Sequence, residues 1–379
     1  MIRHFKIIGL HDKMNFDFKF NNDINILTGK NGAGKTTVLR LIWYLISGNI
    51  DKLIPAIDFD ELEIETTRFM LNLKVSTRQS ELTISWNIGK GEQTKTLNMA
   101  QYQVDKVSQL INQEILQVSQ SSTFFPTFRR IEGGFVTDKP LKTEMGELYE
   151  AFLQEKIFSG LKNAFSDLSN YLSVERHQFV TSVSTDDMTR LLTQQYADIS
   201  ERINQLQNEL SQFITDRTSN TFSTPNTQSD RLEQTLKDIQ TRVDEVKTQK
   251  DEWLRPFTVL SKTVREIFQH QGIQMTDTMT LGNTTEAIAS EKLSSGEKQM
   301  LSFLCYNAFA NNSIILIDEP ELSLHVDWQR LLLRILLQQG SQNQLLIATH
   351  SPFIYAKYPE KELRLDKGTN NATNVTNLG

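Results

Sequence analysis

The sequence predicts an α/β fold: a head that includes an antiparallel β lobe and is interrupted by an inserted antiparallel helical hairpin. Three patterns lead to this prediction. Short apolar strand-like runs alternate with helical runs towards both ends of the chain, a stretch with period-two alternation follows the first of them, and a polar segment with coiled-coil spacing lies between. We expect residues 1–184 and 256–379 to form the two lobes of one head and residues 185–255 to form the hairpin.

The composition is typical of a soluble globular protein. The 379 residues are 38% hydrophobic and 23% charged, enough for one large domain and an insertion. No run approaches 18 consecutive apolar residues and no cleavable signal is visible, so we expect a cytoplasmic protein without a membrane segment. A net charge of −6 excludes a protein that coats nucleic acid over its whole surface, but a local basic patch stays open. The single cysteine, Cys305, excludes a disulfide framework and a cysteine-based zinc site.

The first lobe begins with two or three strands in the first 27 residues, where short apolar stretches alternate with Asp and Asn. Residues 24–27 run into a glycine-rich loop, and residues 36–48 after it place apolar side chains on one face at helical spacing. Residues 62–88 alternate with period two, which predicts an antiparallel meander, and a helix is expected at 99–118. A strand, loop and helix are therefore combined with an antiparallel sheet.

The hairpin is predicted from apolar residues that alternate at spacings of four and three. One series occupies residues 192–213 and another 232–246, and a break rich in Ser, Thr, Asn and Pro separates them at 218–229. The pattern predicts two antiparallel arms of about 22 residues, ~33 Å long at 1.5 Å per residue. Two ordinary amphipathic helices packed on the head are the alternative interpretation.

A phosphate-binding loop is predicted where GKNGAGKT fits G-x-x-x-x-G-K-[ST] between a predicted strand and a predicted helix. Its glycines let backbone N–H groups turn towards phosphates, and the helix N-terminus adds a favourable dipole. We expect Lys35 to contact the β- and γ-phosphates of ATP and Thr36 to offer its hydroxyl to Mg²⁺. The predicted nucleotide-binding residues are Gly29, Lys30, Asn31, Gly32, Ala33, Gly34, Lys35, Thr36 and Thr37.

Two carboxylates, Asp318 and Glu319, end an apolar strand-like run at residues 313–318. Successive strand residues face opposite ways, so the two acids can divide their roles. We expect Asp318 to orient Mg²⁺, with Thr36, and Glu319 to act on the attacking water.

A second anion-binding surface is predicted at Ser294, Ser295, Gly296 and Glu297, just before an apolar helical run. Ser294 and Gly296 can present a hydroxyl and backbone N–H groups at the start of that helix. A simple helix N-cap is the alternative interpretation.

The order of the motifs carries a resemblance to a known family. The phosphate-binding loop, LSSGEKQ at 293–299, ILIDEP at 315–320 and ATHS at 348–351 resemble, in sequence order, the motifs of ABC-type ATPases. The resemblance implies an ABC-type P-loop NTPase head that uses ATP and Mg²⁺ and hydrolyses ATP. It also implies a homodimer, with higher oligomers of dimers left open, in which the signature residues 294–297 of one subunit cap the nucleotide of the other. His350 is implied to contact the γ-phosphate, so the catalytic residues are Lys35, Glu319 and His350.

The segment DEPELSLH at 318–325 narrows the resemblance. Its residues Glu321, Ser323 and His325 correspond to the D-loop, which spans the two sites of the dimer in the family. This segment differs from the corresponding segment of transporter ATPases. It resembles that of the group with the overcoming-lysogenization-defect nucleases, the Septu defence ATPases and SMC-type repair ATPases. From Lys35 to Ser294 the separation is 294 − 35 = 259 residues, because the hairpin is inserted where SMC-type proteins place their coiled coil. The arms are short and lack a Cys-x-x-Cys hook, which excludes long DNA-bridging arms.

Two further pairs of candidate residues lie in the first lobe. Arg129 and Arg130 belong to the aromatic and basic segment FFPTFRR and can contact nucleic acid or reach nucleotide across the dimer. An ion pair with Glu132 or a neighbouring acid is the alternative. Gln117 and Gln120 are candidates for the Q-loop glutamine of the family.

The resemblance implies an ATP-dependent sensor or switch in a bacterial anti-phage defence system. After His350 only 379 − 350 = 29 residues remain, too few for a nuclease domain such as relatives carry. We therefore expect a partner effector protein, a nuclease or a toxin, to supply the output. A DNA-repair ATPase of the SMC or recombination type that binds DNA stays open, as does a binding module with negligible turnover. The helical insertion and the sequence DEPELSLH at 318–325 argue against a transporter subunit.

Overall fold

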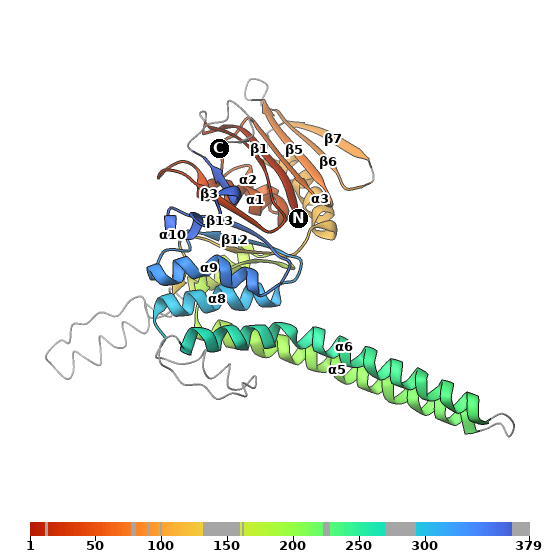
Figure 1. Cartoon of the computed structure of the whole chain (residues 1–379). Coiled ribbons are helices and arrows are strands. Elements are labelled where there is room, and N and C mark those ends of the chain that lie inside the picture. Colours follow the sequence, from red (N-terminus) through yellow and green to blue (C-terminus); the bar gives the residue numbers. More distant parts are fainter. Residues whose placement is uncertain are drawn as a thin grey trace, which may run out of the picture. The chain divides into compact units, whose positions relative to one another are not determined.

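The computed structural model of the chain describes residues 1–11, 14–76, 81–89, 91–98, 101–131, 160, 163–222, 228–269 and 293–365 (Figure 1). It divides into two compact units, one formed by Met1–Ser184 with Ser294–Gly379 and the other by Thr185–Leu293. The second unit begins at the residue where the hairpin is predicted to begin. It ends later than residue 255, because the second helix of the hairpin continues past that residue.

A six-stranded parallel sheet lies in the first unit, with strand order β10-β8-β12-β13-β3-β14. Its strands are β3 (Ile24–Thr28), β8 (Ser122–Phe125), β10 (His177–Phe179), β12 (Ile314–Asp318), β13 (Gln344–Ala348) and β14 (Glu362–Arg364). The neighbours β12, β13 and β3 are buried along their whole length, as expected for parallel strands covered on both faces. Because the strands are parallel, the segments that follow β3, β12 and β13 meet at one edge of the sheet.

A second six-stranded sheet in the same unit is antiparallel, with strand order β2-β1-β4-β5-β6-β7. Its strands are β1 (Ile2–Leu10), β2 (Met14–Lys19), β4 (Glu61–Thr66), β5 (Met70–Ser76), β6 (Glu81–Asn87) and β7 (Glu92–Asn98). Strands β4 and β6 bury every second residue, so the meander predicted from period-two alternation is confirmed. A short parallel pair joins β9 (Arg130–Ile131) to β11 (Ser182–Val183).

Two helices of the first unit, α1 (Lys35–Ile46) and α8 (Ser295–Phe309), bury most of their residues. The unit also contains α2 (Ile50–Leu53), α3 (Gln101–Val118), α9 (Val326–Gln338), α10 (Pro352–Tyr355) and the 3₁₀ helix η1 (Pro359–Lys361), and residues 163–172 are helical as well. The helices predicted at 36–48 and 99–118 correspond to α1 and α3. The predicted α/β fold class, with its antiparallel lobe, is confirmed.

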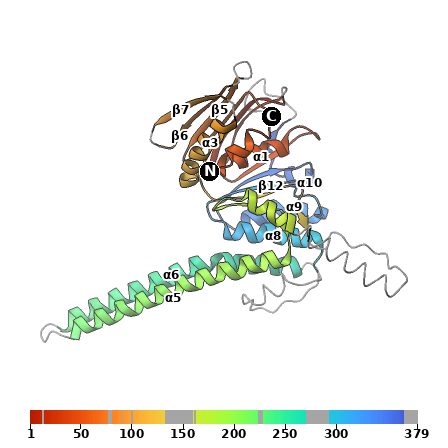
Figure 2. The ribbon, with the colours of Figure 1, turned by 180° about the vertical axis from the view of Figure 1, so that it is seen from behind.

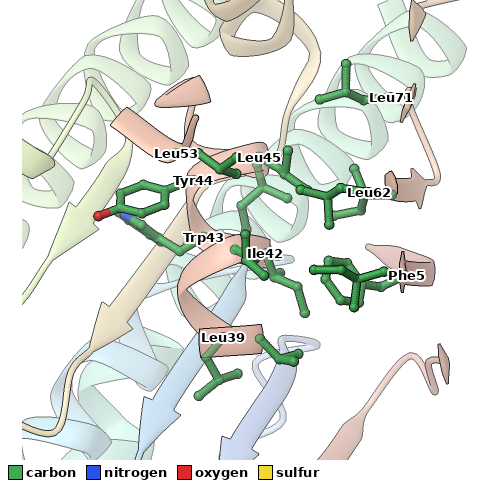
Figure 3. Close-up of a cluster of buried hydrophobic side chains, with 14 of the residues drawn as sticks. Phe5, Leu39, Ile42, Trp43, Tyr44, Leu45, Leu53, Leu62 and Leu71 are labelled. Atoms are coloured by element: carbon green, nitrogen blue, oxygen red, sulfur yellow. The ribbon is translucent and has the colours of Figure 1, made fainter. Parts of the chain in front are cut away.

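Helix α1 forms the centre of the hydrophobic core, which contains side chains of both sheets. Figure 3 shows Leu45 of α1 among side chains of the antiparallel sheet, such as Phe5 and Leu62. The same core includes Leu316 and Leu346 of the parallel sheet. Each large apolar side chain buried in this way contributes about 1.5–3 kcal/mol relative to an exposed one. The core therefore holds α1, and with it the loop that precedes α1, in a fixed place.

Gln344, the first residue of β13, connects the two sheets and is fully buried. Its Oε1 accepts a hydrogen bond from the backbone N–H of Ile2 at 2.8 Å. Its Nε2 donates to the carbonyl oxygens of Ile2 and Asn21, each also at 2.8 Å. One amide side chain thus ties the first strand of the antiparallel sheet to the strand that leads to His350.

The second unit contains two long antiparallel helices, α5 (Thr185–Phe222) and α6 (Gln228–Gln269), which lie side by side in both views (Figures 1 and 2). Their lengths of 38 and 42 residues exceed the predicted arms of about 22 residues. The difference arises because the prediction counted only the apolar series, whereas helix continues through the polar residues on either side. None of the helices in the described part of the chain is long and apolar enough to span a membrane.

The seam between α5 and α6 is more polar than the predicted apolar series. Arg242 of α6 lies 3.8 Å from Glu209 of α5, and Arg217 of α5 lies 3.5 Å from Asp238 of α6. Leu236 of α6, predicted to belong to the series in the seam, is 59% exposed. The rotation of a helix about its own axis decides which of its faces meets a partner helix. The heptad spacing of apolar residues does not by itself distinguish that face from the neighbouring ones.

His177 of β10 is buried in the first unit as a neutral imidazole. Its Nδ1 lies 2.7 Å from the hydroxyl of Ser122 and its Nε2 3.0 Å from the hydroxyl of Ser119. Burial, with a smaller effect of the nearby Arg176, lowers the pKa of His177 to about 4. The unfolded chain protonates this histidine near pH 6.5. Between these two values the unfolded state binds more protons, so stability is lost as the pH falls from about 6.5 to about 4.

We expect the protein to lose up to ~3 kcal/mol of unfolding free energy through His177 across this pH window, from 1.36 kcal/mol per pKa unit. The measurement is thermal unfolding at pH 7, 5.5 and 4.5 for the wild type and for His177→Asn. The variant should be less stable at pH 7 and show the smaller loss on acidification. An equal loss in both proteins would show that other groups cause the acid sensitivity.

Candidate active site

The loop between β3 and α1 has a backbone conformation that depends on glycine. Gly34 is the N-cap residue of α1 and has φ 93°, and Gly32 has φ 80°, both in the left-handed region. Other residues adopt this region at a cost of about 1–2 kcal/mol. The backbone N–H of Ala33 donates to the carbonyl of Lys30 at 3.1 Å, which closes the loop into a turn. The N-terminus of the 12-residue helix α1 therefore faces the loop and favours an anionic group there.

Lys35, the first residue of α1, extends its side chain back across this loop. Its Nζ donates to the carbonyl oxygens of Gly29 at 3.0 Å and Lys30 at 3.2 Å. The same ammonium lies 3.4 Å from Nδ1 of His350. Lys35 is only 5% exposed, so its ammonium group is enclosed between the loop and the end of β13.

Asp318, the last residue of β12, is fully buried and offers oxygen ligands for a hard cation. Its carboxylate accepts hydrogen bonds from the hydroxyls of Thr127 and Thr36, and its Oδ1 has no hydrogen-bond partner within the described residues. Burial raises the pKa of Asp318, and the two hydroxyls oppose this shift. A buried carboxylate oxygen beside a threonine hydroxyl is the kind of donor set that Mg²⁺ prefers. The predicted pair Thr36 and Asp318 therefore fits this ion.

Glu319 follows Asp318 with a left-handed backbone, φ 46°, which is uncommon for glutamate. Its backbone N–H donates to the carbonyl of Ala348 at 2.8 Å, at the end of the neighbouring strand. Its Oε1 lies 3.3 Å from Nε2 of His350. Strained residues of this kind cost about 1–3 kcal/mol and cluster at active sites.

His350 lies between the groups contributed by its two neighbouring strands. Its ring approaches Lys35 with Nδ1 and Glu319 with Nε2, at 3.4 and 3.3 Å. Its backbone N–H donates to Oε1 of Glu321 at 2.6 Å. The structure thus brings together Lys35, His350 and Glu319, which follow β3, β13 and β12 in the order in which these strands lie in the sheet.

The signature residues 294–297 begin helix α8. The hydroxyl of Ser294 accepts from the backbone N–H of Glu297 at 3.4 Å, and the Glu297 carboxylate accepts from the N–H of Ser294 at 2.8 Å. This reciprocal pair is a capping box, and Ser295 is the first residue of the helix. The N-cap interpretation therefore holds in the isolated chain, and a contact with the nucleotide of a second subunit stays a prediction.

Helix α8 packs against the D-loop of its own chain. A Cβ placed on Gly296 would lie 2.4 Å from the carbonyl oxygen of Ser323, itself a left-handed residue with φ 71°. The buried amide of Gln299 donates through Nε2 to the carbonyl of Pro320 at 2.9 Å. The backbone of the D-loop is thus held by two residues of α8, and only Gly296 allows so close an approach.

Replacing Gly296 with Ala is expected to destabilise the protein and to lower any ATP hydrolysis. In an ordinary helix this change stabilises by about 1 kcal/mol. Here the sign reverses because the methyl group meets a backbone carbonyl. Thermal unfolding and phosphate release check the result, and Gly160→Ala is the control because an added Cβ there meets no atom of the described residues within 4 Å. A stabilised, fully active Gly296→Ala variant would contradict the packing.

Gln329 of α9 connects the D-loop to the segment after His350. Its Nε2 donates to the carbonyl of Leu324 at 2.8 Å, and its Oε1 accepts from the hydroxyl of Ser351 at 2.5 Å. The predicted D-loop residue His325 serves as the N-cap of the same helix, accepting from the N–H of Asp327 at 3.5 Å. Gln329 is not among the residues predicted from the sequence, although a signal exists: it lies three and four residues before the buried Leu332 and Leu333, on the apolar face of the helix.

Arg129 differs from its expected role. The sequence allows it a contact with nucleotide or nucleic acid, but the side chain is only 8% exposed. Its guanidinium donates to the carbonyl oxygens of Pro126, Asp318 and Glu319. The guanidinium is therefore bound to buried backbone carbonyls of its own chain, where the sequence allowed a contact with nucleotide or nucleic acid. Arg130 lies in β9, and its side chain, like Glu132, is outside the described residues.

The two candidates for the Q-loop glutamine both lie before β8, away from the edge of the sheet where Asp318 lies. Gln120 precedes β8 and donates to Oδ1 of Asn312, which precedes β12, at 3.3 Å. Both residues lie at the amino ends of parallel strands, and the four residues of β8 span ~13 Å to the other edge. Gln117 lies further back, in α3. Thr127, just past the carboxyl end of β8, makes the contact with Asp318, and its sequence context gave no signal for this role.

Comparisons with known proteins agree with a nucleotide-binding head. The family model described as AAA ATPase domain matches residues 1–355. No curated protein matches the chain.

Two solved structures are similar over most of the chain. The Smc head domain with an extended coiled coil from Pyrococcus furiosus, bound to the C-terminal domain of ScpA, is 12% identical. The match covers 94% of this chain and 91% of that one, with a TM-score of 0.35. The recombination mediator protein RecF with ATP is 10% identical, with 93% and 94% of the chains covered and a TM-score of 0.33. Similarities this low carry no information on substrates or partners.

Proposed function

The chain belongs to the AAA ATPase domain family, and on that premise we propose that it binds ATP at Gly29–Thr37 and hydrolyses it at the sheet edge where Lys35, Glu319 and His350 meet. The observation that supports this most is the position of His350, 3.4 Å from the Lys35 ammonium and 3.3 Å from the Glu319 carboxylate. An ammonium, a carboxylate and an imidazole ring close to both lie near the N-terminus of a helix, where phosphates bind favourably.

In the proposed reaction, water attacks the γ-phosphorus of ATP opposite the bridging oxygen. The bond to that oxygen breaks, and ADP and phosphate are released. The loop N–H groups and the α1 N-terminus hold the phosphates, and Lys35 moves from the loop carbonyls to the β- and γ-phosphate oxygens. Glu319 orients the attacking water and accepts its proton, and His350 contacts the γ-phosphate and keeps the carboxylate in place. Thr36 and Asp318 would hold Mg²⁺, which would supply positive charge beside the phosphate oxygens.

We also propose that the active form is a homodimer in which residues 294–297 of one protomer cap the nucleotide of the other. Ser294 is exposed at the N-terminus of the 15-residue helix α8, where backbone N–H groups favour an anion. The D-loop, which Gly296 and Gln299 of α8 hold, also contacts the backbone of His350 through Glu321. When the dimer closes over the nucleotide at one site, a shift of the D-loop would therefore move His350 through Glu321.

For the biological role, we propose a cytoplasmic sensor or switch in a bacterial anti-phage defence system that controls a partner nuclease or toxin. The proposal is supported by the amino-acid sequence of residues 318–325 and by the helical insertion. The competing role, a DNA-repair ATPase, predicts ATP hydrolysis stimulated by DNA.

One experiment addresses both levels of the proposal. The protein is purified from its native host during phage infection, with neighbouring genes intact, and co-eluting chains and nucleic acid are identified by mass spectrometry. Phosphate release from ATP and Mg²⁺ is measured on the same sample, with and without DNA. A co-purifying nuclease or toxin supports the defence switch. Co-purification of nucleic acid without a protein partner, together with ATP hydrolysis stimulated by DNA, favours the repair role. If none of these samples hydrolyses ATP, the proposed activity is overturned.

A further inference from the structure

A buried arginine spans the backbone beneath the two carboxylates of the site. Nη1 of Arg129 donates to the carbonyl oxygens of Pro126 at 2.8 Å and Asp318 at 2.7 Å, and its Nη2 donates to the carbonyl of Glu319 at 3.1 Å. A guanidinium is planar and presents its donors in a fixed fork. The carbonyls of two consecutive residues, Asp318 and Glu319, are therefore set by one rigid group.

The residue held in this way has the unusual backbone. Glu319 has φ 46°, whereas the strand that it follows is extended. Left-handed glutamate persists where surrounding contacts over-determine it. The N–H of Glu319 is bonded to Ala348 and its carbonyl accepts from Arg129 and from the N–H of Leu322 at 3.2 Å, so both ends of the residue are fixed. The left-handed turn redirects its carboxylate to His350, 3.3 Å away.

The electrostatics show that the arginine is retained at a cost. Burial lowers the pKa of Arg129 to about 10, so the group stays charged at neutral pH, and the nearby Asp318, Glu321 and Glu319 oppose that shift. Its guanidinium also lies 5.4 Å from the ring centre of Phe303 in α8. The nearby acids and the aromatic ring therefore offset part of the cost of burying this charge.

We infer that Arg129 is a positioning residue that fixes Glu319 in the left-handed conformation needed to hold the attacking water. This rests on the proposed function, because the role of Glu319 does. A purely structural arginine would, when replaced, lower stability, ATP binding and hydrolysis together. A positioning arginine lowers the rate of hydrolysis and leaves ATP binding unchanged, because the phosphate loop follows another strand.

The test uses Arg129→Lys, which keeps the charge but cannot span two carbonyls, and Arg129→Gln, which keeps a planar donor without charge. Arg68→Lys is the matched control, since Arg68 donates to the carbonyl of Val118 at 3.0 Å on the surface. We expect kcat to fall about 10²-fold in Arg129→Lys, the size of effect that a displacement of about 1 Å can cause. The Kd for ATP should stay within about twofold of the wild type, and Arg68→Lys should match the wild type.

The outcomes separate the inference from the proposed function. If the wild type hydrolyses ATP, Glu319→Gln does not, and a folded Arg129→Lys keeps the wild-type kcat, only the inference fails. A parallel loss of ATP binding and kcat also overturns it. If neither Arg129 variant folds, a crystal structure of Glu319→Gln with ATP decides: a guanidinium still bonded to the carbonyls of residues 318 and 319 supports the inference, and one turned to the nucleotide contradicts it. A wild type without hydrolysis overturns the proposed function itself.

Discussion

Replacing Glu319 with Gln is expected to lower kcat for ATP hydrolysis about 10²–10⁴-fold, the contribution typical of a general base. The amide cannot accept the proton of the attacking water. Binding should persist, because Lys35 and the loop of residues 29–37 are untouched, and removing one negative charge beside the γ-phosphate should favour ATP. The variant is therefore expected to accumulate as an ATP-bound dimer.

Single-turnover phosphate release, ATP affinity and light scattering in the presence of ATP and Mg²⁺ measure these three effects. Glu92→Gln, an exposed change on β7, serves as a matched control and should behave as the wild type. Wild-type turnover by Glu319→Gln would remove this residue from the mechanism and would favour a binding module over an enzyme. Loss of ATP binding together with hydrolysis would show that the substitution disturbs the fold of the site.

Replacing Lys35 with Met is expected to weaken ATP binding at least about 100-fold. Hydrogen bonds to charged groups contribute about 1.5–3 kcal/mol each, and the ammonium is proposed to meet both the β- and γ-phosphates. Methionine has a similar length and suits a site that is only 5% exposed, so the fold should be retained.

Titration with a fluorescent ATP analogue measures the affinity, and thermal unfolding verifies the fold. The matched control is Lys52→Met in α2, because the Lys52 ammonium donates to Oδ1 of Asn49 and to the carbonyl of Tyr171, both at 2.6 Å, as Lys35 does to its loop. A folded Lys35→Met variant with wild-type affinity would place the nucleotide elsewhere in the chain.

The local parts of the site could be predicted because their signals are local. The loop Gly29–Thr36 is recognised by glycine spacing between an apolar strand and an apolar helical face, and β3 and α1 lie where these patterns predict them. The acidic end of β12 follows from an apolar run interrupted by Asp318 and Glu319. Strand alternation in β4 to β6 is equally local.

The supporting residues could not be predicted, because their partners are distant in sequence. Thr127 and Arg129 contact residues 318 and 319 across 189 to 191 positions of the chain. Only the adjacency of β8 and β12 in the sheet brings them together. Gln120 was a candidate for the Q-loop glutamine in the sequence, but it lies at the amino end of β8, whereas Thr127 lies past the carboxyl end.

The element types of the head, the place of the phosphate loop and the identity of the residues at the ends of three strands are all predicted from the amino-acid sequence. Periodicity and glycine spacing encode these features within one element, where a few neighbouring residues suffice. Three features emerge from the folded chain alone: His350 lies between Lys35 and Glu319, the guanidinium of Arg129 donates to buried backbone carbonyls, and one particular face of α6 meets α5. These outcomes depend on strand order and helix rotation, and both are set by burial and hydrogen bonding summed over the whole core.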